Sequence, residues 1–241
     1  MKRQIPNIFT SLNLFSGCIA AVMVFRNHLD YTAYFVFASA FFDLLDGMIA
    51  RKVGANSEFG KELDSLADAV SFGFVPGAVL FKLFQMSDLQ NYFPDENVRR
   101  FVQFLPFVVT VFSVLRLAKF NLDKRQTSSF IGLPVPANTL FIISFPLILI
   151  TRPGEFDGLI LNPWFILGVT ALMSFMLVSE IPLFALKFKT FALKENIYQY
   201  LLIASAVILG AIFFFSAIPM VIFLYVLLSI IKTNSEKTTA L

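Results

Sequence analysis

The stretches DLLDGMIAR (residues 43–51) and GKELDSLAD (residues 60–68) place four aspartates beside long apolar sequence. Carboxylates in or next to a lipid bilayer are costly, so they usually serve a function. Positions 43, 46, 47, 50 and 51 follow the i, i+3, i+4, i+7, i+8 pattern and share one face of a helix. Asp64 and Asp68 are four residues apart and share a face of the next helix. The short polar linker between the two helices lets both acidic faces converge on one site.

The composition of the chain is that of a membrane protein. Of its 241 residues, 57% are hydrophobic and 15% are charged, whereas a soluble domain carries about 25% charged residues. The apolar residues form several long runs and show no period-two alternation of the outer-membrane barrel type. We therefore expect an all-α, polytopic transmembrane helical bundle that forms a single membrane-embedded domain over residues 1–241.

The apolar runs predict about eight spans. Six of these spans lie within residues 5–190, at about 8–25, 31–50, 63–84, 98–120, 137–150 and 164–186. The run 197–231 is too long for one span, which needs about 20 residues. Ser216-Ala217-Ile218-Pro219 in its middle indicates a turn, so we expect two additional helices within 197–232. A single long, kinked helix is the alternative.

The distribution of basic residues predicts the orientation. With eight spans, most of the 19 Lys and Arg residues fall on the side that holds both termini and the linker 51–62. The positive-inside rule assigns that side to the cytoplasm. The four aspartates therefore lie at the cytoplasmic interface, open to water-soluble ligands.

The residue inventory favours a hard metal ion. Converging carboxylates cannot all stay ionised at close range without cations. Cys18 and His28 are the sole cysteine and histidine, which excludes a Cys/His zinc site. Oxygen ligands alone suit Mg²⁺, Mn²⁺ or Ca²⁺, and two such ions can clamp a phosphoryl group in transfer. Asn7, Thr10 and Asn13 recur every three residues on the first helix and can form a hydrogen-bonding stripe that faces the aspartates.

The pattern D-x-x-D-G-x-x-A-R, eight residues, G-x-x-x-D-x-x-x-D resembles the signature of the CDP-alcohol phosphotransferase family. The matching positions are Asp43, Asp46, Gly47, Ala50, Arg51, Gly60, Asp64 and Asp68. The resemblance implies an integral membrane enzyme with a six-helix core, here at about residues 5–190. Such an enzyme transfers a phosphatidyl-type group from a CDP-linked donor to an alcohol and releases CMP. The resemblance also implies a two-metal site for Mg²⁺ or Mn²⁺ on Asp43, Asp46, Asp64 and Asp68. Asp68 would be the general base, and the protein would be a homodimer.

Three further stretches resemble the branch of this family that makes phosphatidylserine. They are residues 5–17, residues 62–73, and residues 116–121 together with 130–137. This likeness implies CDP-diacylglycerol and L-serine as substrates and the bacterial inner membrane as the location. Lys119 stands where this branch more often has arginine.

The resemblance and the surrounding residue types suggest ligand contacts. The CDP-binding candidates are Asn7, Thr10, Gly47, Ala50, Arg51 and Gly60. Small residues at 47 and 50 leave room for a bulky ligand, and the Arg51 guanidinium can bind phosphate. The serine-binding candidates are Ser71, Arg116, Lys119, Asn121 and Asn138. Besides these substrates, we expect membrane lipids as partners. We do not expect the protein to bind nucleic acid.

Two other functions fit the sequence less well. The same chemistry could use glycerol phosphate, inositol phosphate or choline, although a phosphorylated acceptor would need several extra cations near the site. A divalent-cation transporter would favour acidic residues in the middle of the membrane and an internal repeat. Here the acidic residues gather at one interface, and the chain shows no repeat.

Overall fold

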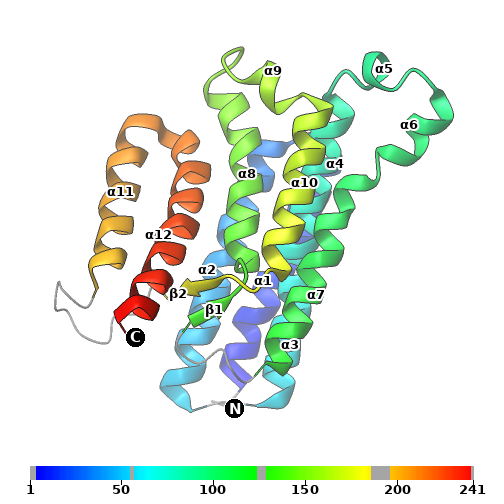
Figure 1. Ribbon diagram of the computed structural model, residues 1–241. Coiled ribbons are helices and arrows are strands. Elements are labelled where there is room, and N and C mark those ends of the chain that lie inside the picture. The colour runs from blue at the N-terminus through cyan, green and yellow to red at the C-terminus, as the bar shows by residue number, and fades with distance from the viewer. Residues whose placement is uncertain (1–3, 55–56, 124–128, 186–195, 240–241) are drawn as a thin grey trace.

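The computed structural model describes residues 4–54, 57–123, 129–185 and 196–239 as a bundle of helices (Figure 1). The first helix begins, and the last helix ends, at the same end of the bundle (Figure 1). Helix α1 (Ile5–Phe25) and helix α2 (Leu29–Val53) form an antiparallel pair. Gly54 ends α2 with a φ of 62°, a left-handed conformation that costs glycine little. The linker after α2 thus starts where the acidic face of the helix ends.

The third rod of the bundle is a helix with a π-helical segment in its middle. Helix α3 (Glu58–Asp68) runs into η2 (Ala69–Phe74), which is π-helical, and then into α4 (Val75–Met86). The Ser57 side chain caps α3 by accepting a hydrogen bond from the Gly60 amide at 3.0 Å. Most of this rod is buried, so it forms the centre of the core.

Hydroxyl groups of neighbouring helices satisfy carbonyls of the π-helical segment. Thr110 Oγ1 donates to the Gly73 carbonyl at 3.0 Å, and Thr139 Oγ1 donates to the Phe72 carbonyl at 2.8 Å. A π-helical turn shifts the register of the helix, and backbone groups within a membrane need partners inside the protein. These two threonines thereby fix the segment that begins directly after Asp68.

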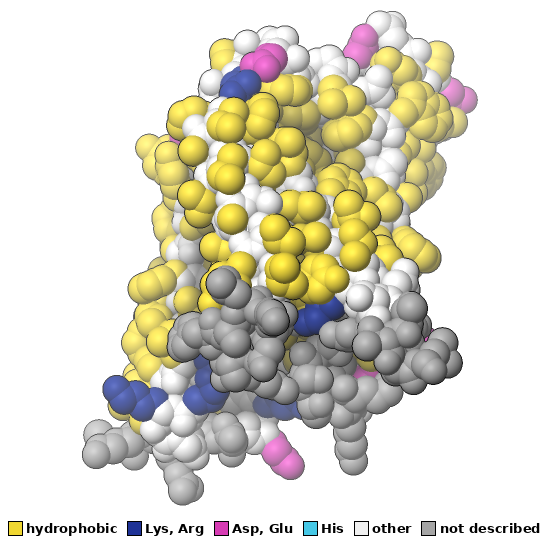
Figure 2. Space-filling model, turned by 60° about the vertical axis from the view of Figure 1, so that its left-hand side comes forward, with side chains coloured by type: hydrophobic (Ala, Val, Ile, Leu, Met, Phe, Trp, Pro, Cys, Tyr) yellow, Lys and Arg dark blue, Asp and Glu magenta, His cyan; other side chains and the backbone are white. Residues whose placement is uncertain are grey.

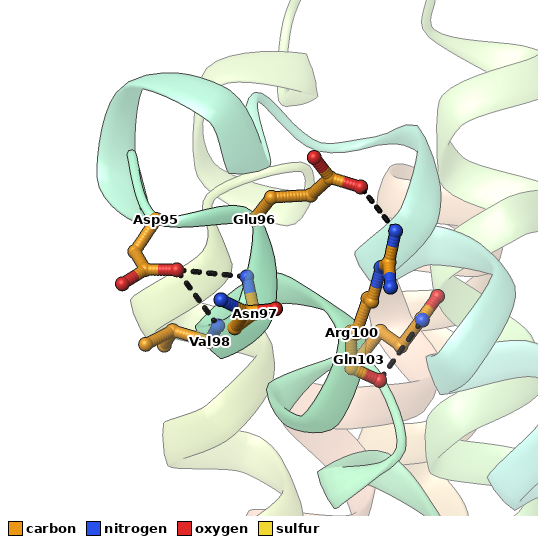
Figure 3. A network of polar contacts seen from close by, with 6 residues as sticks. All are labelled: Asp95, Glu96, Asn97, Val98, Arg100 and Gln103. Atoms are coloured by element: carbon orange, nitrogen blue, oxygen red, sulfur yellow. Dashed lines mark hydrogen bonds and ion pairs between the residues drawn. The ribbon is translucent and has the colours of Figure 1, made fainter.

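The connection to the fourth rod contains two short helices. Helix α5 (Leu89–Tyr92) and helix α6 (Glu96–Val102) lie at the end of the bundle opposite the termini (Figure 1). Asp95 Oδ1 caps α6 by accepting from the amides of Asn97 and Val98, at 2.8 and 3.4 Å (Figure 3). An ion pair of 2.6 Å between Arg100 and Glu96 spans one turn of α6 (Figure 3).

The predicted helix 98–120 is divided. A 3-10 turn, η3 (Leu105–Phe107), separates α6 from α7 (Val108–Leu122). Pro106 lies in this turn, and proline can neither donate a backbone hydrogen bond nor favour a helical residue before it. The part of this rod that crosses the bundle is therefore mainly α7.

The last helix of the core ends earlier than the sequence predicts. Helix α8 (Val135–Thr151) is followed by the short α9 (Asp157–Ile160) and by α10 (Pro163–Val178). The predicted helix 164–186 is wrong over residues 179–185, because Pro182 lacks an N–H group and favours extended backbone before it, and residue 186 lies outside the described residues.

Two short strands that the sequence did not predict follow α10 and precede α8. Strand β2 (Pro182–Phe184) pairs antiparallel with β1 (Ser129–Ile131), with Phe130 opposite Leu183. Gly132 follows β1 with a φ of 75°, and its amide donates to the Ile181 carbonyl at 2.9 Å. The pair joins the start of α8 to the end of α10.

The C-terminal run forms two helices, as predicted. Helix α11 (Ile197–Phe213) and helix α12 (Ala217–Thr239) form a hairpin through the 3-10 turn η4 (Phe214–Ser216) (Figure 1). Phe214 has a φ of 52° at the break, which excludes one continuous helix. Tyr225 of α12 donates its hydroxyl to the carbonyl of Phe184 in β2 at 2.8 Å. This bond ties the hairpin to the core.

The bundle has the surface of an integral membrane protein. Within the described residues, five helical stretches are long and apolar enough to cross a membrane, and α8 and α10 are shorter apolar helices. Figure 2 shows hydrophobic side chains over the middle of one face and charged side chains towards its two ends. The predicted all-α polytopic bundle is confirmed, apart from the two short strands.

Candidate active site

Three of the four aspartates form a cluster that can hold a metal ion. Asp43 on α2 and Asp64 and Asp68 on α3 each offer an oxygen, and these atoms lie within 4.8 Å of one another. Asp64 Oδ1 is buried and has no hydrogen-bond partner among the described residues. A buried carboxylate oxygen without a donor is costly unless a cation binds it. The donor set is oxygen only, which fits Mg²⁺ or Mn²⁺.

Helix α1 holds the fourth aspartate and one member of the cluster. Thr10 Oγ1 donates to Asp46 Oδ2 at 2.7 Å, and both residues are buried. One turn further along α1, Asn13 Nδ2 donates to Asp68 Oδ1 at 3.1 Å. The stripe predicted on the first helix therefore faces the aspartates at Thr10 and Asn13.

A cavity of about 450 Å³ adjoins the aspartates at the end of the bundle that holds the start of α1. The residues that line it are Pro6, Asn7, Thr10, Asp46, Gly47, Ala50, Ser57, Glu58, Gly60, Lys61 and Asp64. Five of the six predicted CDP-binding residues belong to this lining. The sixth, Arg51, lies at the end of α2 with an exposed side chain and is not part of it.

The two glycines of the cavity act differently. A Cβ atom on Gly60 would lie 3.0 Å from Ser57 Oγ and 3.2 Å from Asn7 Oδ1, so glycine lets α3 approach α1. A Cβ atom on Gly47 would meet only the Arg51 guanidinium, at 3.9 Å. Gly47 therefore keeps the floor of the cavity open and is not needed for packing.

Lys61 is a cavity residue that the sequence did not single out. Its ammonium group donates to the Asn121 carbonyl at 3.0 Å and so joins α3 to the end of α7. Nothing in the sequence separates Lys61 from the other surface lysines, since its role depends on contact with a helix 60 residues away.

Two of the predicted serine-binding residues are buried with unsatisfied polar atoms. Arg116 on α7 is 6% exposed, and its Nη2 has no partner within the described part of the chain. Asn138 on α8 is fully buried, and both polar atoms of its amide are likewise without partners there. Buried polar groups are nearly always paired, so these atoms are suited to bind a polar ligand or a water molecule.

The other three predicted serine-binding residues have partners within the protein. Ser71 is fully buried and donates its hydroxyl to the Asn13 carbonyl at 3.1 Å. Lys119 Nζ lies 3.6 Å from a carboxylate oxygen of Glu180. Asn121 Nδ2 donates to Ser65 Oγ at 2.7 Å. These contacts join helices or fix helix ends.

The geometry of this site agrees with a comparison of the sequence with protein families. Residues 3–178 match the family described as CDP-alcohol phosphatidyltransferase. The chain belongs to this family. The match covers the aspartates, the cavity, Arg116 and Asn138, whereas the hairpin of α11 and α12 lies outside it. The family uses divalent metal ions, and the aspartate cluster is a site that can hold one.

Several curated relatives of this chain carry related names. A CDP-diacylglycerol–serine O-phosphatidyltransferase of Helicobacter pylori is 31% identical over 140 residues, which are 57% of this chain and 55% of that protein. The Bacillus subtilis protein of the same name is 31% identical over 150 residues, which are 58% of this chain and 75% of that protein. An archaetidylserine synthase of Methanothermobacter thermautotrophicus is 31% identical over 145 residues, covering 58% and 57% of the two chains. The chain thus spans about half the length of the first and third of these relatives.

Proposed function

We propose that this protein transfers a phosphatidyl group from CDP-diacylglycerol to L-serine, forming phosphatidylserine and CMP. The observation that carries the proposal is the convergence of the aspartates beside a cavity, with buried polar atoms of Arg116 and Asn138 that have no hydrogen-bond partner among the described residues. The names of the relatives support serine as the acceptor.

The acidic cluster would hold the metal ions. Asp43, Asp64 and Asp68 supply oxygens close enough to share an ion, and Asp46 completes a two-metal site for Mg²⁺ or Mn²⁺. Bound ions would neutralise the diphosphate and the departing CMP. Thr10 keeps Asp46 in place through its hydroxyl, so this carboxylate stays oriented before any ligand arrives.

The cavity would take the nucleotide end of the donor. Asn7 and Thr10 offer polar groups, while Gly47, Ala50 and Gly60 leave the backbone accessible. Lys61 adds a positive charge to the lining, and the exposed Arg51 guanidinium, which lies next to Gly47 of the lining, can bind a phosphate. The acyl chains of the donor would remain in the surrounding lipid.

The acceptor would be bound and activated by Asp68, Arg116 and Asn138. Asp68 takes the proton of the serine hydroxyl as the oxygen of that hydroxyl attacks the phosphorus that carries the diacylglycerol. The bond from this phosphorus to the oxygen of CMP breaks, and CMP leaves with the electron pair. The Arg116 guanidinium, which lies within electrostatic reach of Asp68, pairs with the serine carboxylate. Asn138 orients the amino group. Arg116 and Asn138 are preferred for this role over the other predicted serine-binding residues, Ser71, Lys119 and Asn121, which have contacts within the protein.

The orientation and assembly form part of the same proposal. We propose one catalytic domain over residues 1–241 with its core at about 5–190, in a bacterial inner membrane, with both termini and the site in the cytoplasm, working as a homodimer. Figure 1 places the start of α1 and the end of α12 on the side of the cavity, and Figure 2 shows basic side chains gathered towards that end. These features agree with the positive-inside rule.

An acceptor panel tests the proposal. Purified protein receives CDP-diacylglycerol, Mg²⁺ or Mn²⁺, and serine, glycerol phosphate, inositol phosphate or choline in turn, and CMP release is followed. We expect release with serine and a matching amount of phosphatidylserine. Equal release without serine, or faster release with another alcohol, would overturn the choice of acceptor. Cation uptake into vesicles without CMP release would instead indicate a transporter.

A further inference from the structure

Asn13 lies in the middle of α1 and is completely buried. Its Nδ2 donates to Asp68 Oδ1 at 3.1 Å, whereas its own Oδ1 has no partner among the described residues. A carboxylate that has lost its proton can only accept hydrogen bonds, so this contact fixes which end of the amide faces Asp68. The amide group therefore has one defined orientation.

The backbone of Asn13 is held from two sides. Ser39 of α2 and Ser71 of η2 both donate their hydroxyls to the Asn13 carbonyl, at 3.0 and 3.1 Å. Both serines are fully buried. Three segments thus meet at this one carbonyl oxygen, and their contact sets the height and rotation of α1 at the site.

A glycine makes this meeting possible. A Cβ atom on Gly17, one turn beyond Asn13, would lie 2.2 Å from Ser71 Oγ and 2.9 Å from Ser71 Cα. Any other residue would separate α1 from η2. The π-helical segment starts directly after Asp68, so the carboxylate and the Ser71 hydroxyl both reach α1 within one turn.

We propose that Asn13 is a positioning residue for Asp68, held in turn by Ser39 and Ser71. The amide occupies one oxygen of the Asp68 carboxylate and leaves the other free for the metal ions or for the proton of the acceptor. This inference rests on the proposed function, because it assigns Asp68 its role there. Ser71 thereby serves the site through Asn13 and does not bind the acceptor.

The substitution Asn13→Leu tests this role, since leucine keeps the size of the side chain and removes the donor. Loss of this hydrogen bond to a charged group should lower kcat by about 10- to 100-fold. The KM for CDP-diacylglycerol and for serine should stay within about twofold, because Asn13 acts through Asp68 and not on either substrate. Ser11→Ala is the matched control on the same helix, since the Ser11 hydroxyl is exposed and, among the described residues, bonds only to the Asn7 carbonyl.

A second variant covers the case in which Asn13→Leu does not fold. The double variant Ser39→Ala, Ser71→Ala keeps the Asn13 amide but removes both hydrogen bonds to the Asn13 backbone carbonyl. We expect kcat to fall by about 3- to 30-fold at unchanged KM. Asn13→Leu with at least about half of the wild-type kcat would overturn the inference. So would a double variant with wild-type kcat, or a loss that appears only as a raised KM. If the wild-type protein released no CMP with serine, the proposed function itself would fail, and the two failures are therefore distinguishable.

Discussion

Replacing Gly17 by alanine should push apart two helices that carry the site. The added Cβ atom would lie 2.2 Å from Ser71 Oγ, 2.9 Å from Ser71 Cβ and 2.9 Å from Ser71 Cα. The hydroxyl can rotate away if it gives up its bond to the Asn13 carbonyl. The Cα atom belongs to the backbone and cannot rotate away, so α1 and η2 must separate until the contact reaches 3.4 Å.

The size of the effect follows from these two contacts. The lost hydrogen bond costs about 1 kcal/mol, and forcing extra volume into a packed core costs about 1–3 kcal/mol. Together they lower the free energy of unfolding by about 2–4 kcal/mol. For a chain of this length, 1 kcal/mol corresponds to about 2–4 °C in Tm, so the Tm should fall by about 5–15 °C. Because Asn13 moves with α1, kcat should fall as well.

Two measurements test these effects. Thermal unfolding in detergent gives the Tm, and CMP release at a temperature where both proteins are folded gives kcat. Gly168→Ala is the matched control, because a Cβ atom on Gly168 in α10 would meet no atom within 4 Å. The control should keep or slightly raise the Tm, since alanine favours helix over glycine. Gly17→Ala with the Tm and kcat of this control would refute the close packing of α1 against η2.

Three other substitutions test separate parts of the account. Thr10→Val removes the 2.7 Å bond to Asp46 at constant shape and should lower kcat/KM about 10- to 100-fold, and an unchanged CMP release rate would contradict it. Arg116→Gln should raise the KM for serine about tenfold or more while the KM for CDP-diacylglycerol stays constant, and equal changes in both constants would argue against a carboxylate contact. Gly132→Ala combines a φ of 75° with a Cβ atom 2.7 Å from the Leu177 carbonyl oxygen, so it should lower the Tm, and a wild-type melting curve would exclude this strain.

The sequence predicted those parts of the site that depend on helical periodicity. The aspartates on 43–51 and 60–68 share faces because their spacing follows the helical repeat, and Thr10 and Asn13 reach them because they lie on one stripe of α1. The division of the C-terminal run was also predictable, since its length exceeds one span. In each case the signal is local to one helix or set by the thickness of the bilayer.

The features that the sequence did not predict depend on contacts between distant segments. The π-helical segment after Asp68 is fixed by hydroxyls from α7 and α8, and nothing within residues 69–74 indicates it. The pairing of β1 with β2 joins two segments about 50 residues apart, and each strand is only three residues long. The hydrogen bond from Ser71 to the backbone carbonyl of Asn13 was not predicted, because a backbone carbonyl carries no signal in the sequence.

Incorporation of labelled serine into lipid tests the central claim most directly. The assay contains CDP-diacylglycerol and Mg²⁺ or Mn²⁺, with and without a chelator. It is run on the wild-type protein, on Asp68→Asn and on Glu62→Gln. Glu62 is an exposed residue of α3 outside the cavity lining, so its variant matches the change in charge without touching the site. We predict that the wild type and Glu62→Gln make labelled phosphatidylserine and one CMP for each lipid, and that the chelator abolishes this. Asp68→Asn should be slower by a factor on the order of 10²–10⁴, the usual contribution of a general base. Full activity in Asp68→Asn, or product formation that does not depend on the metal, would contradict the account.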